Sequence, residues 1–280
     1  MVVFPNAKIN LGLNILRKRA DGFHDLSTIF YPIPLQDVLE IVPQQQRDAK
    51  ADVVLYSTGL AVVGNIDNNI CVKAYRLLKA DFPNLPAIAL HLHKIIPMGA
   101  GMGGGSADGA FTLRLLNEQF QLQLTQAQLI NYALQLGSDC PFFIINKPAI
   151  GKGRGEDLNP VQLDLSAYSI AIVNPGIHVP TGWAFQQIKP GLPRYDCALV
   201  IQDAPDTWRG RLINDFEAPI VAHYPEIGKA IEILYAQGAV YAAMSGSGST
   251  VFGIFPKTGT PQLQWPEHYF YKLLSLDKLS

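Results

Sequence analysis

The segment that most constrains this chain runs from Pro97 to Ser106 and reads Pro-Met-Gly-Ala-Gly-Met-Gly-Gly-Gly-Ser. Five of the seven residues from Gly99 to Gly105 are glycines. Because glycine has no Cβ, backbone N–H groups in such a loop can turn toward one centre. A helical pattern begins at about Ser106, and the unpaired N–H groups and dipole of a helix start favour an anion. The segment therefore predicts a phosphate-binding loop, whereas a flexible linker is not expected between two strongly patterned flanks.

Two well-known nucleotide motifs do not explain this loop. Gly99, Gly101 and Gly104 match G-x-G-x-x-G, but a dinucleotide site needs an acidic residue at the end of the next strand, about 20 residues on. Glu118 stands at that distance within or just after a predicted helix, and a second helical pattern follows instead of a strand. A Walker loop needs a lysine after its glycines, and this loop has none.

Composition excludes several classes of partner. The chain has 280 residues, 48% hydrophobic and 16% charged, which fits a globular protein of one large or two smaller domains. Its 22 basic and 23 acidic residues leave a net charge of −1, so nucleic acid is not an expected partner. No apolar stretch approaches the ~20 residues of a membrane span, so a membrane is not expected either. Three widely spaced cysteines form neither a disulfide framework nor a metal-ligand set, which predicts a reducing, cytoplasmic location.

The hydrophobic pattern mixes the periods of strands and helices. Alternation over Ala7–Ile15 predicts a half-buried strand, with Lys8 and Asn10 projecting from the same open face. Further strands are expected at 37–42, 52–56, 87–94, 142–145, 169–173, 240–244 and 251–255. Helices are expected from an Asn68 cap to Lys79, from about Ser106, from a Thr125 capping box to Gly137, after a Thr181 cap, and over 224–237. This mixture predicts an α+β protein rather than regular βαβ repeats.

Several segments together resemble one family. A proline followed by a glycine-rich loop and serine is similar to the signature of the GHMP kinases. Ala7–Asn10, Ala20–His24 and Gly137–Pro141 resemble the branch of that family that phosphorylates 4-diphosphocytidyl-2-C-methyl-D-erythritol in the non-mevalonate isoprenoid pathway. Asn214–Glu217 and Ser245–Ser249 fit the second half of the same branch.

The resemblance implies a two-domain α+β fold. Residues 1–155 are expected to form an ATP-binding and catalytic domain like domain 2 of ribosomal protein S5. Residues 156–280 are expected to form a ferredoxin-like α/β sandwich that binds the substrate. ATP, with Mg²⁺, is the expected cofactor, a small-molecule cytidine diphosphate is the expected partner, and the oligomeric state, monomer or homodimer, stays open.

By the resemblance, Asp139 is the catalytic base and Lys8 its charged partner. Transfer of a phosphoryl group to an alcohol benefits from a carboxylate that orients the hydroxyl and accepts its proton. A neighbouring ammonium keeps that carboxylate ionised and stabilises the charge that develops on the transferred group. Read alone, Asp139 is equally a turn residue and Lys8 a surface residue.

The acceptor and the nucleotide are assigned further residues by the same resemblance. Phe23 and Phe185 are expected to stack on the cytosine, His24 to hydrogen-bond to it, Asn10 to bind the erythritol hydroxyls, and Thr181 to contact the substrate. The residues expected to bind the nucleotide are Pro97, Met98, Gly99, Ala100, Gly101, Met102, Gly103, Gly104, Gly105, Ser106, Asp108, Asn69, Ile70 and Lys94. Ser106 is also the one side chain suggested as a metal ligand.

The chain departs from the usual family pattern at three positions. Met102 stands where many members have Leu, Ala107 where they have a second Ser, and Phe23 where many have Tyr. The change to Met102 conserves volume, whereas the change to Ala107 leaves more of the phosphate contact to Ser106. Two alternatives stay open: a GHMP kinase acting on mevalonate, homoserine or a sugar, and an inactive nucleotide sensor of the same fold.

Overall fold

The computed structural model describes residues 1–44, 51–62, 64–258 and 261–277. The chain folds as two compact units, each assembled from separate stretches of sequence. Unit 1 comprises Met1–Ala7, Leu35–Met98 and Gly103–Asn146, and unit 2 comprises Lys8–Pro34, Gly99–Met102 and Lys147–Ser280. The expected domain boundary at 155/156 stays a prediction.

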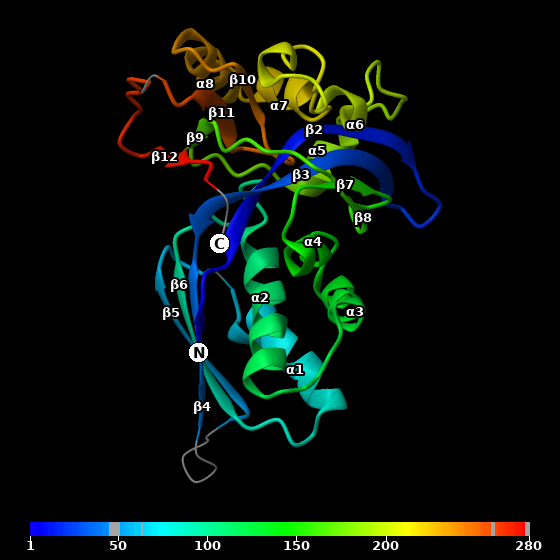
Figure 1. Ribbon diagram of the computed structural model, residues 1–280, viewed down its shortest axis with the longest axis vertical. Helices are drawn as coiled ribbons and strands as arrows, with labels where there is room; N and C mark the ends of the chain where they lie inside the picture. The colour runs from blue at the N-terminus through cyan, green and yellow to red at the C-terminus, as the bar shows by residue number, and fades with distance from the viewer. Residues whose placement is uncertain (45–50, 63, 259–260, 278–280) are drawn as a thin grey trace. The chain divides into compact units, whose positions relative to one another are not determined.

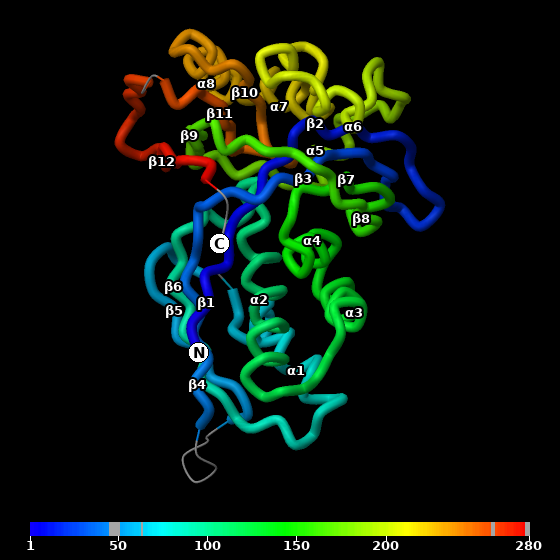
Figure 2. The backbone as a smooth tube through the Cα atoms, in the orientation of Figure 1, coloured from blue at the N-terminus to red at the C-terminus, as the bar shows by residue number. Residues whose placement is uncertain are grey.

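The sheet of unit 1 has the strand order β1-β4-β6-β5. Its strands are β1 (Val2–Val3), β4 (Val38–Pro43), β5 (Val53–Gly59) and β6 (Ile88–Lys94). β6 pairs antiparallel with β4 and parallel with β5, and Figure 2 shows β1 beside β4 at the start of the chain. Leu90 and Leu92 are buried while His91 and His93 are exposed. The strand that enters the glycine loop thus has one solvent-facing side, unlike the central strand of a dinucleotide-binding sheet.

The helices of unit 1 lie together beside this sheet, as Figure 1 shows. They are η1 (Ile66–Asn68), α1 (Ile70–Asp81), α2 (Gly104–Gln119), α3 (Gln126–Leu136) and α4 (Cys140–Ile145). The Thr125 capping box is confirmed. The cap of α1 is Asn69, whose side chain accepts a hydrogen bond from the N–H of Cys71, and not Asn68 as expected. α2 starts two residues earlier than expected because Gly103 takes a left-handed conformation, at φ +68°, that begins the helix there.

The strand expected at 142–145 is wrong, because these residues belong to α4. A short, continuously apolar run has no periodicity that separates a buried strand from a buried helix. Pro141, at the first turn of α4, was the signal that favours the helix, since proline fits a helix start and has no N–H to lose.

Unit 2 contains two sheets. β2 (Asn6–Lys18), β3 (His24–Gln36), β7 (Ala149–Lys152) and β8 (Asp157–Pro160) form one, in that order, although β2 begins and β3 ends in unit 1. β10 (Tyr241–Met244), β11 (Val251–Pro256), β9 (Tyr168–Asn174) and β12 (Phe270–Ser275) form the other, with antiparallel pairs throughout. The open face expected for β2 is wrong: Lys8 is only 3% exposed and Asn10 only 1%.

The helices of unit 2 are α5 (Thr181–Gln186), α6 (Cys197–Val200), η2 (Pro205–Thr207), α7 (Glu217–His223) and α8 (Pro225–Ala236). α8 packs on β10 and β11, and the three elements lie close together in Figure 1. Its buried face, with Ile227 and Leu234, joins Val251 and Phe255 in one core. Thr181 does not cap α5 as expected: the cap residue is Pro180, and the helix start has no side-chain cap.

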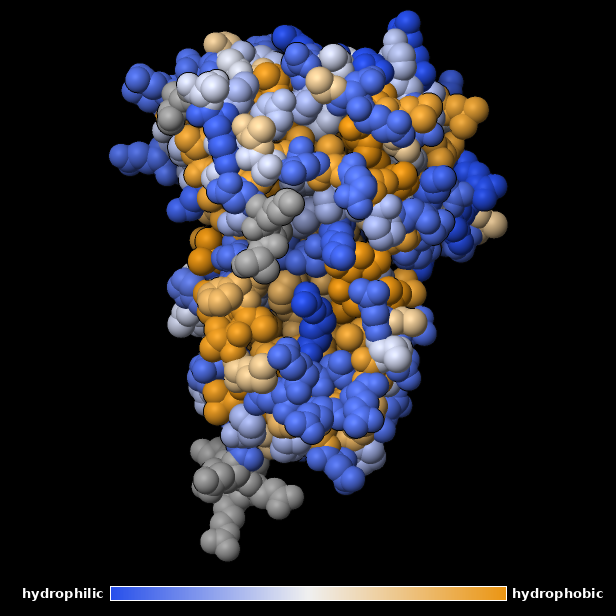
Figure 3. Space-filling model, in the orientation of Figure 1, coloured by the Kyte–Doolittle hydropathy of each residue, from blue (hydrophilic) through white to orange (hydrophobic). Residues whose placement is uncertain are grey.

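Apolar side chains also reach the surface of unit 1. Met1, Val2, Phe4 and Tyr56 are each about half exposed, and Figure 3 shows hydrophobic surface among hydrophilic surface on the near side of this unit. Scattered exposed apolar groups are normal on a protein surface. Among the described residues, no helix combines the length and the apolar character that crossing a membrane requires.

Candidate active site

In unit 1, both ends of the glycine loop lie close together. The first residue of α2, Gly104, packs so closely that an added Cβ would lie 2.8 Å from Cγ2 of Ile96 and 3.1 Å from Nζ of Lys94. A side chain at this position would therefore push the start of α2 away from the strand that enters the loop. Ser106 lies in the first turn of α2, where helix N–H groups without partners in the helix favour an anion.

A buried ion-pair cluster lies next to both ends of the loop. Nζ of Lys94 donates to Oδ2 of Asp37 and, over 2.9 Å, to Oδ2 of Asp108. Lys94 is 1% exposed, Asp37 is fully buried and Asp108 is 2% exposed. Burial raises the pKa of Asp108 to about 7, although the charge of Lys94 acts in the opposite direction. Asp37 carried no signal in the sequence, since an aspartate just before a strand is an ordinary residue there.

Four of the predicted nucleotide residues converge at the start of α2. Ile70 lies so close to Gly109 that a Cβ there would be 2.7 Å from Cγ1 of Ile70. Asn69 precedes Ile70 and caps α1, while Gly109 follows Asp108, which contacts Lys94. Residues up to 39 positions apart in the sequence thus lie together near the start of α2 in unit 1.

The candidate base, Asp139, lies at the beginning of α4, one residue before Cys140. The side chains of Cys140 and Ser106 are hydrogen-bonded, so the start of α4 lies against the first turn of α2. Burial raises the pKa of the Cys140 thiol to about 12, although its hydrogen bond with Ser106 acts in the opposite direction. Asp139 is half-buried and its side chain does not cap α4. Its carboxylate therefore belongs to the same part of unit 1 as the helix end of the loop.

In unit 2, Lys8 lies against the middle of the glycine loop. Its backbone N–H donates to the carbonyl of Met102 over 3.0 Å, and its Nζ donates to the carbonyl of Gly101 over 3.3 Å. Nζ also donates to Oδ1 of Asn10 over 2.7 Å, so the two residues share one face of β2, as the alternation predicted. The ammonium lies 5.2 Å from the centre of the Phe30 ring.

Ser245 connects this face of β2 to the loop. Its Oγ donates to the carbonyl of Gly101 over 2.8 Å and accepts from the N–H of Asn10 over 3.3 Å. Nδ2 of Asn10 donates to Oγ1 of Thr28 over 2.9 Å. Gly101 has φ +80°, and an added Cβ would lie 2.0 Å from the carbonyl oxygen of Ser245. Only glycine fits at this contact.

The Asn214–Glu217 segment makes hydrogen bonds to the backbone on both sides of Ser245. Nδ2 of Asn214 donates to the carbonyls of Met244 and Gly246 over 2.7 and 2.8 Å, and Glu217 accepts from the N–H of Met244 over 2.9 Å. Asp215 accepts from the N–H of Ile15 on β2. The sequence singled out this segment by resemblance without a role, and the structure gives it one: it connects β2 and the loop after β10.

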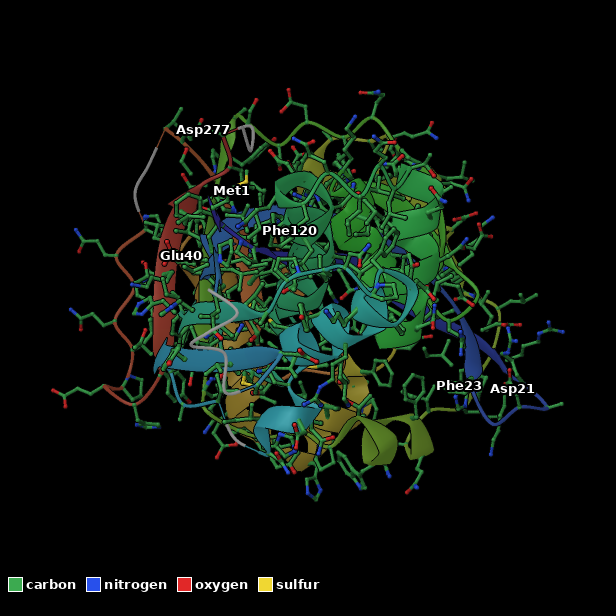
Figure 4. The ribbon with its side chains drawn as sticks, turned by 90° about the horizontal axis from the view of Figure 1, so that it is seen from below. Met1, Asp21, Phe23, Glu40, Phe120 and Asp277 are labelled. Atoms are coloured by element: carbon green, nitrogen blue, oxygen red, sulfur yellow. The ribbon has the colours of Figure 1, made fainter. Side chains whose placement is uncertain are left out.

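The predicted cytosine residues lie near the hairpin between β2 and β3. Figure 4 shows Phe23 and Asp21 at the tip of that hairpin. Phe23 is 52% exposed, and the Arg154 guanidinium lies 4.9 Å from its ring centre. His24 stacks directly on Phe185, with ring centres 4.7 Å apart and planes inclined by 16°. Burial, with the charge of Lys18, lowers the pKa of His24 below its usual value. Sequence reasoning missed Arg154, which only this packing makes noticeable.

Four further predicted residues are Thr181 and Met98–Ala100. Thr181 is exposed, with its Oγ1 3.3 Å from Oγ of Ser247. Met98 is 48% exposed. An added Cβ at Gly99 would lie 3.8 Å from the ring of His178, and the carbonyl of Ala100 accepts from the N–H of Thr250. Unit 2 thus holds Gly99–Met102 through contacts with β2 and with the loop after β10.

Comparison with known proteins tests the resemblance to the GHMP kinases. Residues 69–147 match the GHMP kinases N terminal domain, and residues 201–264 match GHMP kinases C terminal. The 4-diphosphocytidyl-2-C-methyl-D-erythritol kinase of Bacteroides fragilis (strain ATCC 25285) is 50% identical over 255 residues, which is 91% of this chain and 92% of that protein. The chain belongs to the GHMP kinase family. It is therefore a kinase, and ATP is its phosphate donor.

Further relatives agree. The enzyme of the same name from Bacteroides thetaiotaomicron is 48% identical over 271 residues, 96% of this chain and 98% of that protein. A crystal structure of 4-(cytidine 5'-diphospho)-2C-methyl-D-erythritol kinase matches with TM-score 0.76 and 28% identity, over 98% of this chain and 99% of that one. Methanococcus jannaschii mevalonate kinase matches with TM-score 0.68 at 12% identity, which shows the fold alone. The expected α+β, two-domain GHMP kinase fold is confirmed.

Proposed function

We propose that this GHMP kinase transfers the γ-phosphoryl group of ATP to the free 2-hydroxyl of 4-diphosphocytidyl-2-C-methyl-D-erythritol. The products are the 2-phosphate and ADP, in a step of non-mevalonate isoprenoid biosynthesis. The observation that carries the proposal is the position of Lys8, whose backbone and ammonium both contact the glycine loop at Gly101 and Met102. A fixed cation at a phosphate-binding loop suits the transfer of a charged group, because phosphoryl transfer depends mainly on positioning and charge stabilisation.

In this proposal Asp139 orients the acceptor hydroxyl and accepts its proton, and Lys8 stabilises the charge on the transferred group. Asn10 holds a hydroxyl of the erythritol, which its position on the same face as Lys8 supports. Phe23, His24 and Phe185 bind the cytosine, which the stacking of His24 on Phe185 and the position of Phe23 next to His24 in the chain support. Thr181 stays a predicted substrate contact.

Mg²⁺ is part of the proposal as the ion that accompanies ATP. The described residues contain no group of three or more His, Cys, Asp or Glu side chains arranged to hold a metal. Mg²⁺ bound with a nucleotide usually needs only one or two protein oxygens beside phosphates and water. The hydroxyl of Ser106, in the first turn of α2, fits such a role. The ion would neutralise charge on the β- and γ-phosphates.

The location and partners of the protein also stay proposals. We propose a cytoplasmic enzyme with a small cytidine diphosphate as its partner. Three reduced cysteines support the location, since none of them forms a disulfide.

A coupled kinase assay tests the reaction. The wild-type protein should consume ATP with the cytidine acceptor and not with mevalonate, homoserine or a sugar. Asp139→Asn should lower kcat by about 100-fold or more, the usual contribution of a general base. The matched control is Asp157→Asn, which removes an exposed carboxylate of β8 and should leave kcat unchanged. Turnover of mevalonate alone would exclude the proposed acceptor, and an unchanged kcat in Asp139→Asn would exclude the proposed base.

A further inference from the structure

The Asp37–Lys94–Asp108 cluster joins three elements at the glycine loop. Asp37 lies between β3 and β4, Lys94 is the last residue of β6, and Asp108 is in the second turn of α2. Ten of the thirteen residues between Lys94 and Asp108 form the loop from Pro97 to Ser106. The hydrogen bond from Lys94 to Asp108 therefore connects the strand that enters the loop directly to the helix that leaves it.

A second set of contacts holds the chain just before the loop. Oδ1 of Asp37 accepts from the backbone N–H groups of Ile95 and Ile96, over 2.5 and 2.9 Å. These two residues link β6 to Pro97. Ile96 and Lys94 in turn meet Gly104 at distances that leave no space for a side chain. The two ends of the loop are thus fixed to each other by ion pairs, by backbone hydrogen bonds and by close packing.

This cluster is a poor device for stability alone. It places two carboxylates and one ammonium out of water, and the desolvation of buried ions commonly exceeds their attraction. Within the described part of the chain, Oδ1 of Asp108 is buried and has no hydrogen-bond partner. Apolar clusters of the same volume are often at least as stabilising as buried ions. What ions provide and apolar groups do not is a directional connection between defined atoms.

We propose that Asp37, Lys94 and Asp108 are positioning residues, which hold the two ends of the glycine loop at the separation that ATP binding requires. Lys94 and Asp108 then act on the nucleotide through the loop, since their charged groups are buried and face each other. With the ends fixed, the loop binds phosphate without first being ordered, and pre-organised sites bind more tightly for that reason. The inference rests on ATP as the phosphate donor and is independent of the acceptor.

The test compares nucleotide binding in Asp108→Ala with binding in the wild-type protein. The dissociation constant of ADP is measured by calorimetry, and KM values for ATP and for the cytidine acceptor are measured in the coupled assay. We expect the ADP dissociation constant and the KM for ATP to rise about tenfold, equivalent to about 1.4 kcal/mol. The KM for the acceptor should stay within about twofold of its original value. Asp108→Asn keeps an oxygen that can accept from Lys94, so it should restore most of the affinity for ADP.

A matched control separates positioning from a general weakening of α2. Thr112→Val, one turn further along α2, removes a buried hydroxyl that donates to the carbonyl of Asp108. It should lower the melting temperature, because the carbonyl of Asp108 loses that bond, yet leave the ADP affinity unchanged. If Thr112→Val weakens ADP binding equally, or if Asp108→Ala leaves it unchanged, the inference is wrong. If Asp108→Ala does not fold, Asp108→Ser takes its place, because it keeps a polar group at this buried position but is too short to reach Lys94. We expect a weaker ADP affinity in Asp108→Ser than in Thr112→Val, and equal affinities would contradict the inference.

The two proposals fail in different ways. Wild-type protein that binds ADP but does not phosphorylate the cytidine acceptor contradicts the proposed function and leaves the positioning inference standing. Normal turnover of that acceptor, with equal ADP affinity in wild type and Asp108→Ala, contradicts the positioning inference alone.

Discussion

At the scale of a single residue, both polar side-chain atoms of Asn214 have hydrogen-bond partners. It is 2% exposed, donates to two carbonyls of the loop after β10, and accepts from the N–H of Phe216 over 3.0 Å. Leaving buried polar groups without partners costs about 1–3 kcal/mol each. The residue therefore contributes both to the stability of unit 2 and to the position of Ser245.

Replacing Asn214 should consequently affect stability and catalysis together. We expect Asn214→Ala to lower the free energy of unfolding by about 3 kcal/mol and to lower kcat, because Ser245 loses the support behind its contact with Gly101. Urea unfolding and the coupled assay measure the two effects. Asn159→Ala, at an exposed position of β8, is the control and should change neither. A fully active Asn214→Ala protein would contradict the role given to this segment.

His24 sets a pH dependence at the same scale. Because burial lowers its pKa below the usual value of about 6.5, the ring is neutral at pH 7, the form that in the proposed function accepts a hydrogen bond from the acceptor. The charged form appears only as the pH falls through the lowered pKa. We therefore expect the KM for the cytidine acceptor to stay constant from about pH 7 to 8.5 and to rise below about pH 6.

The control for this prediction is His24→Phe, which keeps an aromatic ring on Phe185 but cannot titrate. Its KM should be higher than that of the wild type and independent of pH over the same range. A wild-type KM that rises toward high pH would show that another group is responsible.

At the scale of elements, the glycine loop is constrained most strongly at Gly101. Its φ of +80° is unfavourable for other residues by about 1 kcal/mol or more, and an added Cβ would lie 2.0 Å from a backbone oxygen. We expect Gly101→Ala to lower kcat/KM by about 100-fold, because the loop must move away from Ser245 and Lys8.

The control variant Gly238→Ala separates the effect of a positive φ from the effect of the close contact with Ser245. Gly238 also has a positive φ, +94°, but an added Cβ there meets nothing within 4 Å. It should lose about 1 kcal/mol of stability and keep its activity. If Gly101→Ala behaves like Gly238→Ala, the contact with Ser245 does not matter for catalysis.

The same scale shows what could be predicted from sequence. Elements with a clear period, such as β6, or with a capping box, such as α3, were placed within one or two residues. α4 was missed because a short apolar run fits a strand or a helix equally well. The shared face of Lys8 and Asn10 followed from the alternation of β2, but its burial did not, since it depends on partners such as Ser245 and Thr28 that are distant in sequence. Asp37 was missed for the same reason.

At the scale of the whole molecule, the three cysteines are all buried. Burial raises the pKa of Cys140 and Cys197 to about 12 and raises that of Cys71 further. Because the thiolate is the reactive form, we expect none of the three to react with a thiol reagent in the native protein at pH 8. All three should react in denaturant, and absorbance of the released chromophore counts them. Rapid reaction of the native protein would contradict their burial.

Because its three cysteines are buried, the protein is suitable for labelling at an introduced cysteine without removing any of its own. A cysteine introduced in place of Leu192, which is 92% exposed, would react with a label in unit 2. A second cysteine in place of Tyr56, which is also exposed, would carry a label in unit 1. A dye pair attached at these two positions would report by energy transfer whether nucleotide or acceptor changes the separation of the probes.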